Sequence, residues 1–153
     1  MIKKLNKGFT LIELLVVIGI LAILLSITLI AINPARQFGN ANDTKRRSNV
    51  TQILNAIGAF QAENQGQLPD SVKALPTDTP NDIAATPMAS LCADLVPNYI
   101  PALPTDPGLN AQDIEAADCA SNWNTGYKIT KDAQNRLTIS ATGDVTTNIS
   151  VSR

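Results

Sequence analysis

An uninterrupted apolar run near the N-terminus limits what this chain can fold into more than any other feature of its sequence. Residues 9–32 are 24 positions long, and 19 of them are apolar. As an α-helix with a rise of about 1.5 Å per residue, the run spans roughly 36 Å, enough to cross a hydrocarbon core of about 30 Å. Lys3, Lys4 and Lys7 precede it, and the polar bulk of the chain follows it. The positive-inside rule therefore predicts a transmembrane helix with a cytoplasmic N-terminus and an exported C-terminal part.

The composition argues against most enzymatic chemistry. The chain has 153 residues, no His and two Cys, which excludes His-based triads, His-ligated metals and four-thiolate zinc sites. We find no nucleophile-base pair and no glycine-rich phosphate loop, so we do not expect an enzyme. The net charge of −1 gives no footprint for nucleic acid, and we expect no specific nucleic-acid site. The length suits one exported domain, residues 33–153, after the helix.

A secretory signal peptide and a plain membrane anchor each leave part of the N-terminal segment unexplained. A signal peptide should end in a small-residue cleavage site, whereas residues 29–34 read LIAINP. A plain anchor gives no reason for Glu13, because a carboxylate inside a spanning helix costs about 2–3 kcal/mol on insertion scales and usually marks a function. Such a carboxylate needs a partner. Cleavage after Gly8 would create one, an α-amino group on Phe9 of the same or a neighbouring chain.

The chain begins MIKKLNKG and continues FTLIELLVVIGILAIL. This sequence resembles the signal of type IV pilins and pseudopilins, in which a basic leader ends in Gly and a prepilin peptidase cuts before Phe and methylates it. The resemblance implies a cleaved leader at residues 1–8, N-methylation of Phe9 after cleavage behind Gly8, and Glu13 as the carboxylate that guides assembly. It also implies partners: copies of the chain in a helical filament, the prepilin peptidase, the pilus assembly platform, and the membrane before assembly.

Beyond the apolar run, the sequence predicts a second helical half and a small sheet. Pro34 should kink or locally melt the helix, because proline lacks an amide donor. Apolar residues then recur at helical spacing and predict an amphipathic helix over 41–64; they are Val50, Ile53, Leu54, Ile57 and Phe60. Alternating apolar residues predict three antiparallel strands within 126–152 that cover this helix. We therefore expect an α+β, pilin-like fold, with a long N-terminal helix, half transmembrane and half amphipathic, packed on a small C-terminal antiparallel sheet.

Between the second helix and the strands, residues 69–107 hold eight of the nine prolines. This density predicts a loop region with one short helical piece near 84–95. The segment LVPNYIPALPTDPG, residues 95–108, resembles a loop of pseudopilins and minimal bacterial pilins. Cys92 and Cys119 bracket this loop, and an even pair of cysteines in an exported region favours a disulfide over two free thiols.

Oxygen-bearing side chains crowd the end of the same loop. Asp106, Asn110 and Asp113 are the candidate calcium ligands, with Glu115 and Asp118 close behind them. Hard oxygen ligands suit Ca²⁺, and major pseudopilins carry a calcium site in a comparable region. The spacing matches no EF-hand loop, however, and acidic loops are usually only solvated. No other cofactor is expected.

Lys45, Arg46 and Arg47 form a basic cluster outside the leader. Two functional interpretations are contact with anionic lipid headgroups and contact with acidic residues of adjacent subunits. A solvated helix face explains the cluster equally well.

The favoured function is structural. The mature chain is expected to polymerise into a type IV pilus filament on the bacterial surface, serving adhesion, motility or DNA uptake. It would wait as a single-pass precursor in the inner or cytoplasmic membrane before it joins the extracellular filament. The alternatives are a pseudopilin of a type II secretion or competence machine and a membrane-anchored exported binding protein.

Overall fold

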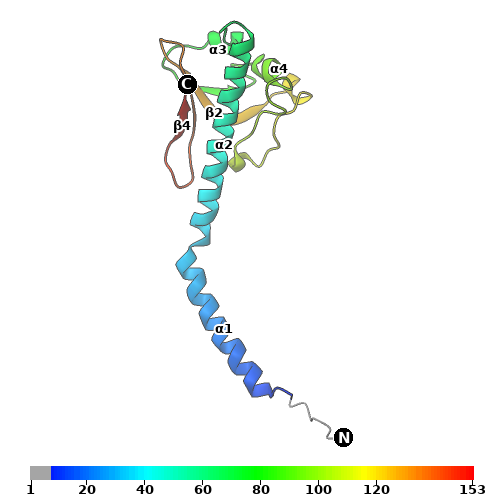
Figure 1. The fold of residues 1–153 in the computed structure, drawn as a ribbon, viewed down its shortest axis with the longest axis vertical. Helices are drawn as coiled ribbons and strands as arrows, with labels where there is room; N and C mark the ends of the chain where they lie inside the picture. Colours follow the sequence, from blue (N-terminus) through cyan, green and yellow to red (C-terminus); the bar gives the residue numbers. More distant parts are fainter. Residues whose placement is uncertain (1–7) are drawn as a thin grey trace. The chain divides into compact units, whose positions relative to one another are not determined.

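The computed structural model describes residues 8–153, so the leader lysines lie outside the described residues. The chain divides into two compact units, the first ending at Phe38 and the second spanning Gly39–Arg153. Figure 1 shows the elements in chain order, with α1 (Leu11–Ile32) followed by α2 (Pro34–Glu63) and then by the small elements of the second unit. The order is that of a long N-terminal apolar helix followed by a small antiparallel sheet, which confirms the predicted α+β, pilin-like fold class.

The helical region is interrupted at one residue, Asn33, which lies between α1 and α2 with φ 46° and ψ 78°. A residue before proline is disfavoured in the right-handed helical region, and Asn tolerates the left-handed one. Pro34 is the first residue of α2, where the missing amide donor costs nothing and the fixed φ suits a helix. Pro34 therefore starts a helix, and α2 begins seven residues before the predicted start at 41.

Four strands form one antiparallel sheet in the order β1-β2-β3-β4. Their bounds are β1 Asn81–Ala84, β2 Asn124–Lys131, β3 Leu137–Ala141 and β4 Ile149–Ser152. Ile139 in β3 pairs with Ile129 in β2 and with Val151 in β4. The three predicted strands are therefore present, with a fourth, β1, paired to the outer edge of β2.

The proline-rich region 69–107 is more ordered than predicted. It contains two short helices, α3 (Asp70–Lys73) and α4 (Leu91–Leu95), as well as the strand β1. β1 fits into the short stretch after Pro80, where proline immediately before a strand removes no ladder hydrogen bond. The short helical piece predicted near 84–95 is present as α4. The expectation that the rest is loop is wrong at α3 and β1, because a four-residue strand can be held by a longer neighbour.

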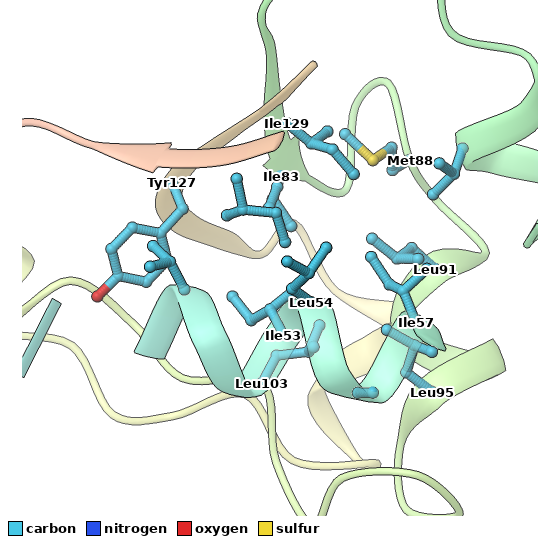
Figure 2. Packing of buried hydrophobic residues seen from close by; sticks show 14 of the residues in the cluster. Ile53, Leu54, Ile57, Ile83, Met88, Leu91, Leu95, Leu103, Tyr127 and Ile129 are labelled. Atoms are coloured by element: carbon cyan, nitrogen blue, oxygen red, sulfur yellow. The ribbon is translucent and has the colours of Figure 1, made fainter. Parts of the chain in front are cut away.

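The core of the second unit lies between α2 and one face of the sheet, as Figure 2 shows. The predicted stripe of α2 is buried at Val50, Ile53, Leu54 and Ile57, while Phe60 is partly buried. The inward residues of the sheet alternate as predicted, and residues of the connecting segments and of α4 complete the core. The buried residues on the strands are Ile83, Tyr127, Ile129, Leu137, Ile139 and Ile149. Those outside the strands include Met88, Leu91, Leu95, Leu103 and Trp123.

Candidate functional site

The predicted cleavage junction between Gly8 and Phe9 lies before the first turn of α1. Both residues are exposed, with Phe9 83% exposed. Among the described residues other than its chain neighbours, no atom lies within 4 Å of a Cβ built on Gly8. The peptide bond between them is outside the helical hydrogen-bond ladder, which begins after the N-cap Thr10. A peptidase can therefore reach this bond without unwinding α1.

Thr10 and Glu13 form a capping box at the start of α1. The Thr10 Oγ1 accepts a hydrogen bond from the Glu13 backbone N–H at 3.3 Å. In return, Glu13 Oε2 accepts hydrogen bonds from the Thr10 backbone N–H at 2.9 Å and from the Thr10 hydroxyl at 2.8 Å. The carboxylate also lies at the positive end of the helix dipole. Glu13 thus has hydrogen-bond donors within its own chain, at Thr10. The sequence predicted only an α-amino group as the partner of this carboxylate.

α1 presents apolar side chains on every side. Its mean hydropathy over the best 18-residue window is 3.1, and none of its residues is buried. Glu13 is the only charged residue between Leu11 and Ile32. Its 22 residues span about 33 Å at the usual helical rise. By length and composition α1 can cross a membrane, and its apolar surface needs a cover that the described part of the chain does not supply.

Arg46 does not belong to a surface basic cluster. Its side chain is 5% exposed and pairs with three carboxylates. Nε and Nη2 donate to Asp106 Oδ2 and Oδ1 at 2.8 and 3.0 Å, while Nη1 lies 3.0 Å from Asp43 Oδ1 and 2.9 Å from Asp144 Oδ1. The hydrogen bonds to Asp106 are the main cause that raises the pKa of Arg46. For Arg46, lipid contact and a solvated face are both wrong; Lys45 and Arg47 remain exposed.

Asp43 fastens the loop between β3 and β4 to α2. Its carboxylate accepts hydrogen bonds from the backbone N–H groups of Asp144, Val145 and Thr146 at 2.7, 3.0 and 2.7 Å. The bond from Thr146 is the largest cause that holds the pKa of Asp43 well below its usual value, and Arg46 adds to it. The Asn42 amide donates to Asp144 at 2.9 Å and holds the pKa of that carboxyl low as well.

Asn49 on α2 is a buried polar residue, at 4% exposure. Its amide donates to the Thr105 carbonyl at 3.0 Å and to the Tyr127 hydroxyl at 2.8 Å. The Tyr127 hydroxyl in turn donates to the Thr105 carbonyl at 3.3 Å. Burial raises the pKa of Tyr127 to about 12. These contacts tie α2, the 103–110 loop and β2 together.

The candidate calcium ligands are partly occupied by protein donors. Both Asp106 oxygens accept hydrogen bonds from Arg46, and Asp113 Oδ1 accepts one from the Thr105 N–H at 2.9 Å. Asn110 is exposed. Within residues 8–153 no group of three or more His, Cys, Asp or Glu is arranged to hold a metal ion. Calcium binding at these residues stays a prediction, and at Asp106 it would displace the guanidinium.

Cys92 and Cys119 form the disulfide that the sequence favours, with their Cα atoms 5.3 Å apart. Cys92 lies on α4 and is fully buried, and Cys119 lies in the 3₁₀ turn Asp118–Ala120. The bond therefore joins the proline-rich region to the segment that leads into β2.

Three contacts were not predicted from the sequence, although a local pattern existed for two of them. Thr-x-x-Glu before an apolar run is the signature of a capping box, so the contact between Thr10 and Glu13 could have been predicted from the sequence. The ion pair between Asp43 and Arg46 could also have been predicted, because residues at i and i+3 face each other on a helix. Asp106 lies 60 residues from Arg46 along the chain, and no local pattern links them.

One comparison with known proteins gives a match. The model of the prokaryotic N-terminal methylation motif matches residues 3–29. No curated protein matches the chain, and no solved structure matches it either. The matched residues include the Gly8–Phe9 junction, the capping box and most of α1. The chain therefore carries a prepilin-type signal of the kind found in type IV pilins and pseudopilins, which implies processing by a prepilin peptidase.

Proposed function

We propose that the mature chain is a structural subunit of a type IV pilus filament on the bacterial surface, where it serves adhesion, motility or DNA uptake. The observation that supports the proposal is α1, a 22-residue helix that is apolar on all sides, bears one carboxylate in its first turn and follows the exposed residues Gly8 and Phe9. Lipid covers this surface while the precursor spans the cytoplasmic membrane. Copies of the same helix cover it in the filament.

The apolar surface explains why the assembled state would be a filament. Outside the bilayer, burial of apolar side chains against neighbouring copies drives association. A contact that repeats from chain to chain without closing gives an open helical polymer. Glu13 adds register, because a carboxylate buried without an amine partner is penalised and an in-register neighbour removes the penalty.

Substitution of Glu13 tests this role. Glu13→Ala should leave membrane insertion and leader removal intact but lower the amount of sheared filament at least about tenfold, because loss of a buried charge pair costs on the order of 2–5 kcal/mol. Ser26→Ala is the matched control, since the Ser26 hydroxyl only bonds the Ala22 carbonyl within α1; its filament amount should stay normal. Normal filament numbers in Glu13→Ala would refute the proposal.

Gly8→Leu tests the junction itself. This variant should accumulate in membranes with its leader attached. A leaderless Gly8→Leu protein would show that the cleavage site lies elsewhere.

The second candidate function is a pseudopilin of a type II secretion or competence machine. The short leader and the loop at residues 95–108 suggest it, because the loop sequence LVPNYIPALPTDPG resembles a loop of pseudopilins, although minimal bacterial pilins share it. A pseudopilin would show the same processing but would be absent from the sheared surface fraction.

A further inference from the structure

A hollow of about 390 Å³ lies where side chains of α2, α3 and the start of α4 come together. It is at the C-terminal end of α2, near the labels α3 and α4 in Figure 1. Small-ligand sites typically have volumes of roughly 300–1,000 Å³. None of the described residues of the prepilin-type signal lines the hollow, so leader processing does not account for it.

The apolar side of the hollow is formed by Phe60 and Leu68. Leu68 is buried, whereas the Phe60 ring is only partly buried. Tyr99 packs edge to face against this ring, with the ring centroids 5.5 Å apart and the planes at 65°. The Tyr99 hydroxyl donates a hydrogen bond to Glu63 Oε2 at 2.6 Å. The plane of the Phe60 ring is therefore fixed before any ligand binds.

The polar side chains that line the hollow keep much of their hydrogen-bonding capacity. Lys73 Nζ lies 3.6 Å from Asp70 Oδ1, too far for a hydrogen bond, so the amine keeps its three donors. Asp94 Oδ2 accepts a hydrogen bond from the Ser90 hydroxyl at 3.1 Å, one of about four that a carboxylate can accept. Gln67 is exposed and offers both donors and an acceptor.

An aromatic wall among mixed donors and acceptors suits a neutral saccharide. A pyranose ring has an apolar face of C–H bonds, which packs on an aromatic ring, and a rim of hydroxyls that both donate and accept. Asp70 and Asp94 can accept hydrogen bonds from such hydroxyls, and Lys73 and Gln67 can donate to them. The two carboxylates disfavour an anionic ligand, and the Lys73 amine disfavours a cationic one.

A second hollow, of about 190 Å³, adjoins the first at the turn between α2 and α3. Gln67, Leu68 and Lys73 line both hollows, and the amides of Gln61 and Asn135 also line the second. A ligand of two sugar rings can therefore occupy both hollows, with Gln67 and Lys73 in reach of each ring.

We propose that the two hollows form one site, the α2–α3 groove, and that it binds a neutral saccharide of two or more pyranose rings with one ring stacked on Phe60. The groove is lined by Phe60, Gln67, Leu68, Lys73 and Asp94, among others. The inference deepens the proposed function and rests on it, because it names the class of ligand through which a surface filament would adhere. The binding itself is a property of the single chain.

Ligand-observed NMR on the full chain tests the inference, in a detergent without a sugar headgroup. The probes are methyl β-D-glucopyranoside, methyl β-D-galactopyranoside, cellobiose and lactose. The affinity per atom that is usual for small ligands places the Kd of a single ring on the order of 1–10 mM. At least one monosaccharide should bind in this range, and the disaccharide that ends in the same sugar should bind at least about threefold more tightly.

Variants locate the bound sugar. Phe60→Leu keeps an apolar side chain but removes the ring, and it should weaken binding about fivefold. Gln67→Ala removes an exposed amide and should weaken disaccharide binding about three- to tenfold. Gln52→Ala is the matched control, because Gln52 is an exposed glutamine of α2 outside the groove; its affinity should equal that of the wild-type chain. Gln67→Ala carries the test if Phe60→Leu fails to fold.

The inference is overturned if none of the four sugars binds the wild-type chain. It is also overturned if Phe60→Leu and Gln67→Ala bind sugar as tightly as Gln52→Ala does. Binding of trilysine at lower concentrations than any of the sugars would overturn it as well and would assign the groove to a basic peptide. A failure of the proposed function is a separate result, since it is measured by the absence of the chain from the sheared surface fraction.

Discussion

At position 46 the chain buries a guanidinium among three carboxylates, which determines what its substitution costs. Arg46→Ala would leave Asp43 buried beside Asp106 without their cation, and removal of one partner from a buried ion pair typically costs about 3–5 kcal/mol. Arg47→Ala, one residue away on the exposed side, should change the free energy of unfolding by less than about 0.5 kcal/mol.

Trp123 provides the measurement. It is the only Trp of the chain and is buried, so its fluorescence follows unfolding of the second unit in the detergent-solubilised protein. Equal denaturation midpoints for Arg46→Ala and Arg47→Ala would contradict the structural role of Arg46.

The lowered pKa of Asp43 makes the stability of the folded chain depend on pH. Its hydrogen bonds with Thr146, Asp144 and Val145 lower its pKa in the folded chain, so folding favours the ionised form. Stability from this group is therefore fully present above the unfolded pKa of about 3.9 and is lost as pH falls below that value. Denaturation midpoints should drop between about pH 4 and pH 2, and Asp43→Asn should be less stable at neutral pH with a flatter acid limb.

Asp70→Asn is the control for that profile, because the Asp70 side chain is 95% exposed. Its acid limb should match the wild-type one. A wild-type midpoint that does not change from pH 5 to pH 2 would contradict the assignment, since the pKa of Asp43 would then be the same folded and unfolded.

Single residues also show how far sequence reasoning reaches. The prepilin-type signal that contains Gly8, Phe9 and Glu13 could be recognised because its residues are contiguous in the sequence; their roles stay predictions. The burial of Arg46 could not be predicted, because two of its three partners, Asp106 and Asp144, come from loops far along the chain, and three adjacent basic residues look alike in sequence. The burial of Asn49 could not be predicted for the same reason: its acceptors lie on the 103–110 loop and on β2, far from it along the chain.

Among the elements, α4 and the turn before β2 depend on the bond between Cys92 and Cys119. The cysteines are 27 positions apart, and loop-closure entropy for such a length gives about 3.6 kcal/mol of stabilisation. The double variant Cys92→Ala, Cys119→Ala should lose an amount of this order in denaturant unfolding.

Reduction offers the matched control. A reductant should lower the denaturation midpoint of the wild-type chain and leave that of the double variant unchanged. A loss below about 1 kcal/mol in both experiments would mean that the disulfide does not restrict the unfolded chain as expected.

Among the helices and strands, those with a strong local sequence pattern could be predicted and those with a weak one could not. The strands β2 to β4 and the buried stripe of α2 have clear periods of 2 and 3.6, and both were predicted correctly. β1 has only four residues and lies among prolines, so nothing in its sequence outweighed the turn signals. The interruption predicted at Pro34 is present at Asn33, the residue before it, and Pro34 itself is the first residue of α2, where proline is common.

At the scale of the whole molecule, the two units differ in how much of their apolar side chains they bury. The second unit has its own core, a disulfide and buried ionic contacts, whereas α1 in the first unit buries none of its residues. Such a division suits a chain whose apolar helix changes environment, from lipid to neighbouring copies, while the globular unit stays folded. The central claim is that the helix makes this change after cleavage behind Gly8.

Mass spectrometry of the N-terminal peptide tests this claim most directly, run separately on a sheared extracellular fraction and on membranes of the native host. We predict abundant chains in the sheared fraction that begin with methylated Phe9. Methylated Phe9 confined to membranes would contradict a surface filament and favour the pseudopilin alternative. An intact leader from Met1 to Gly8 in both fractions would contradict processing altogether.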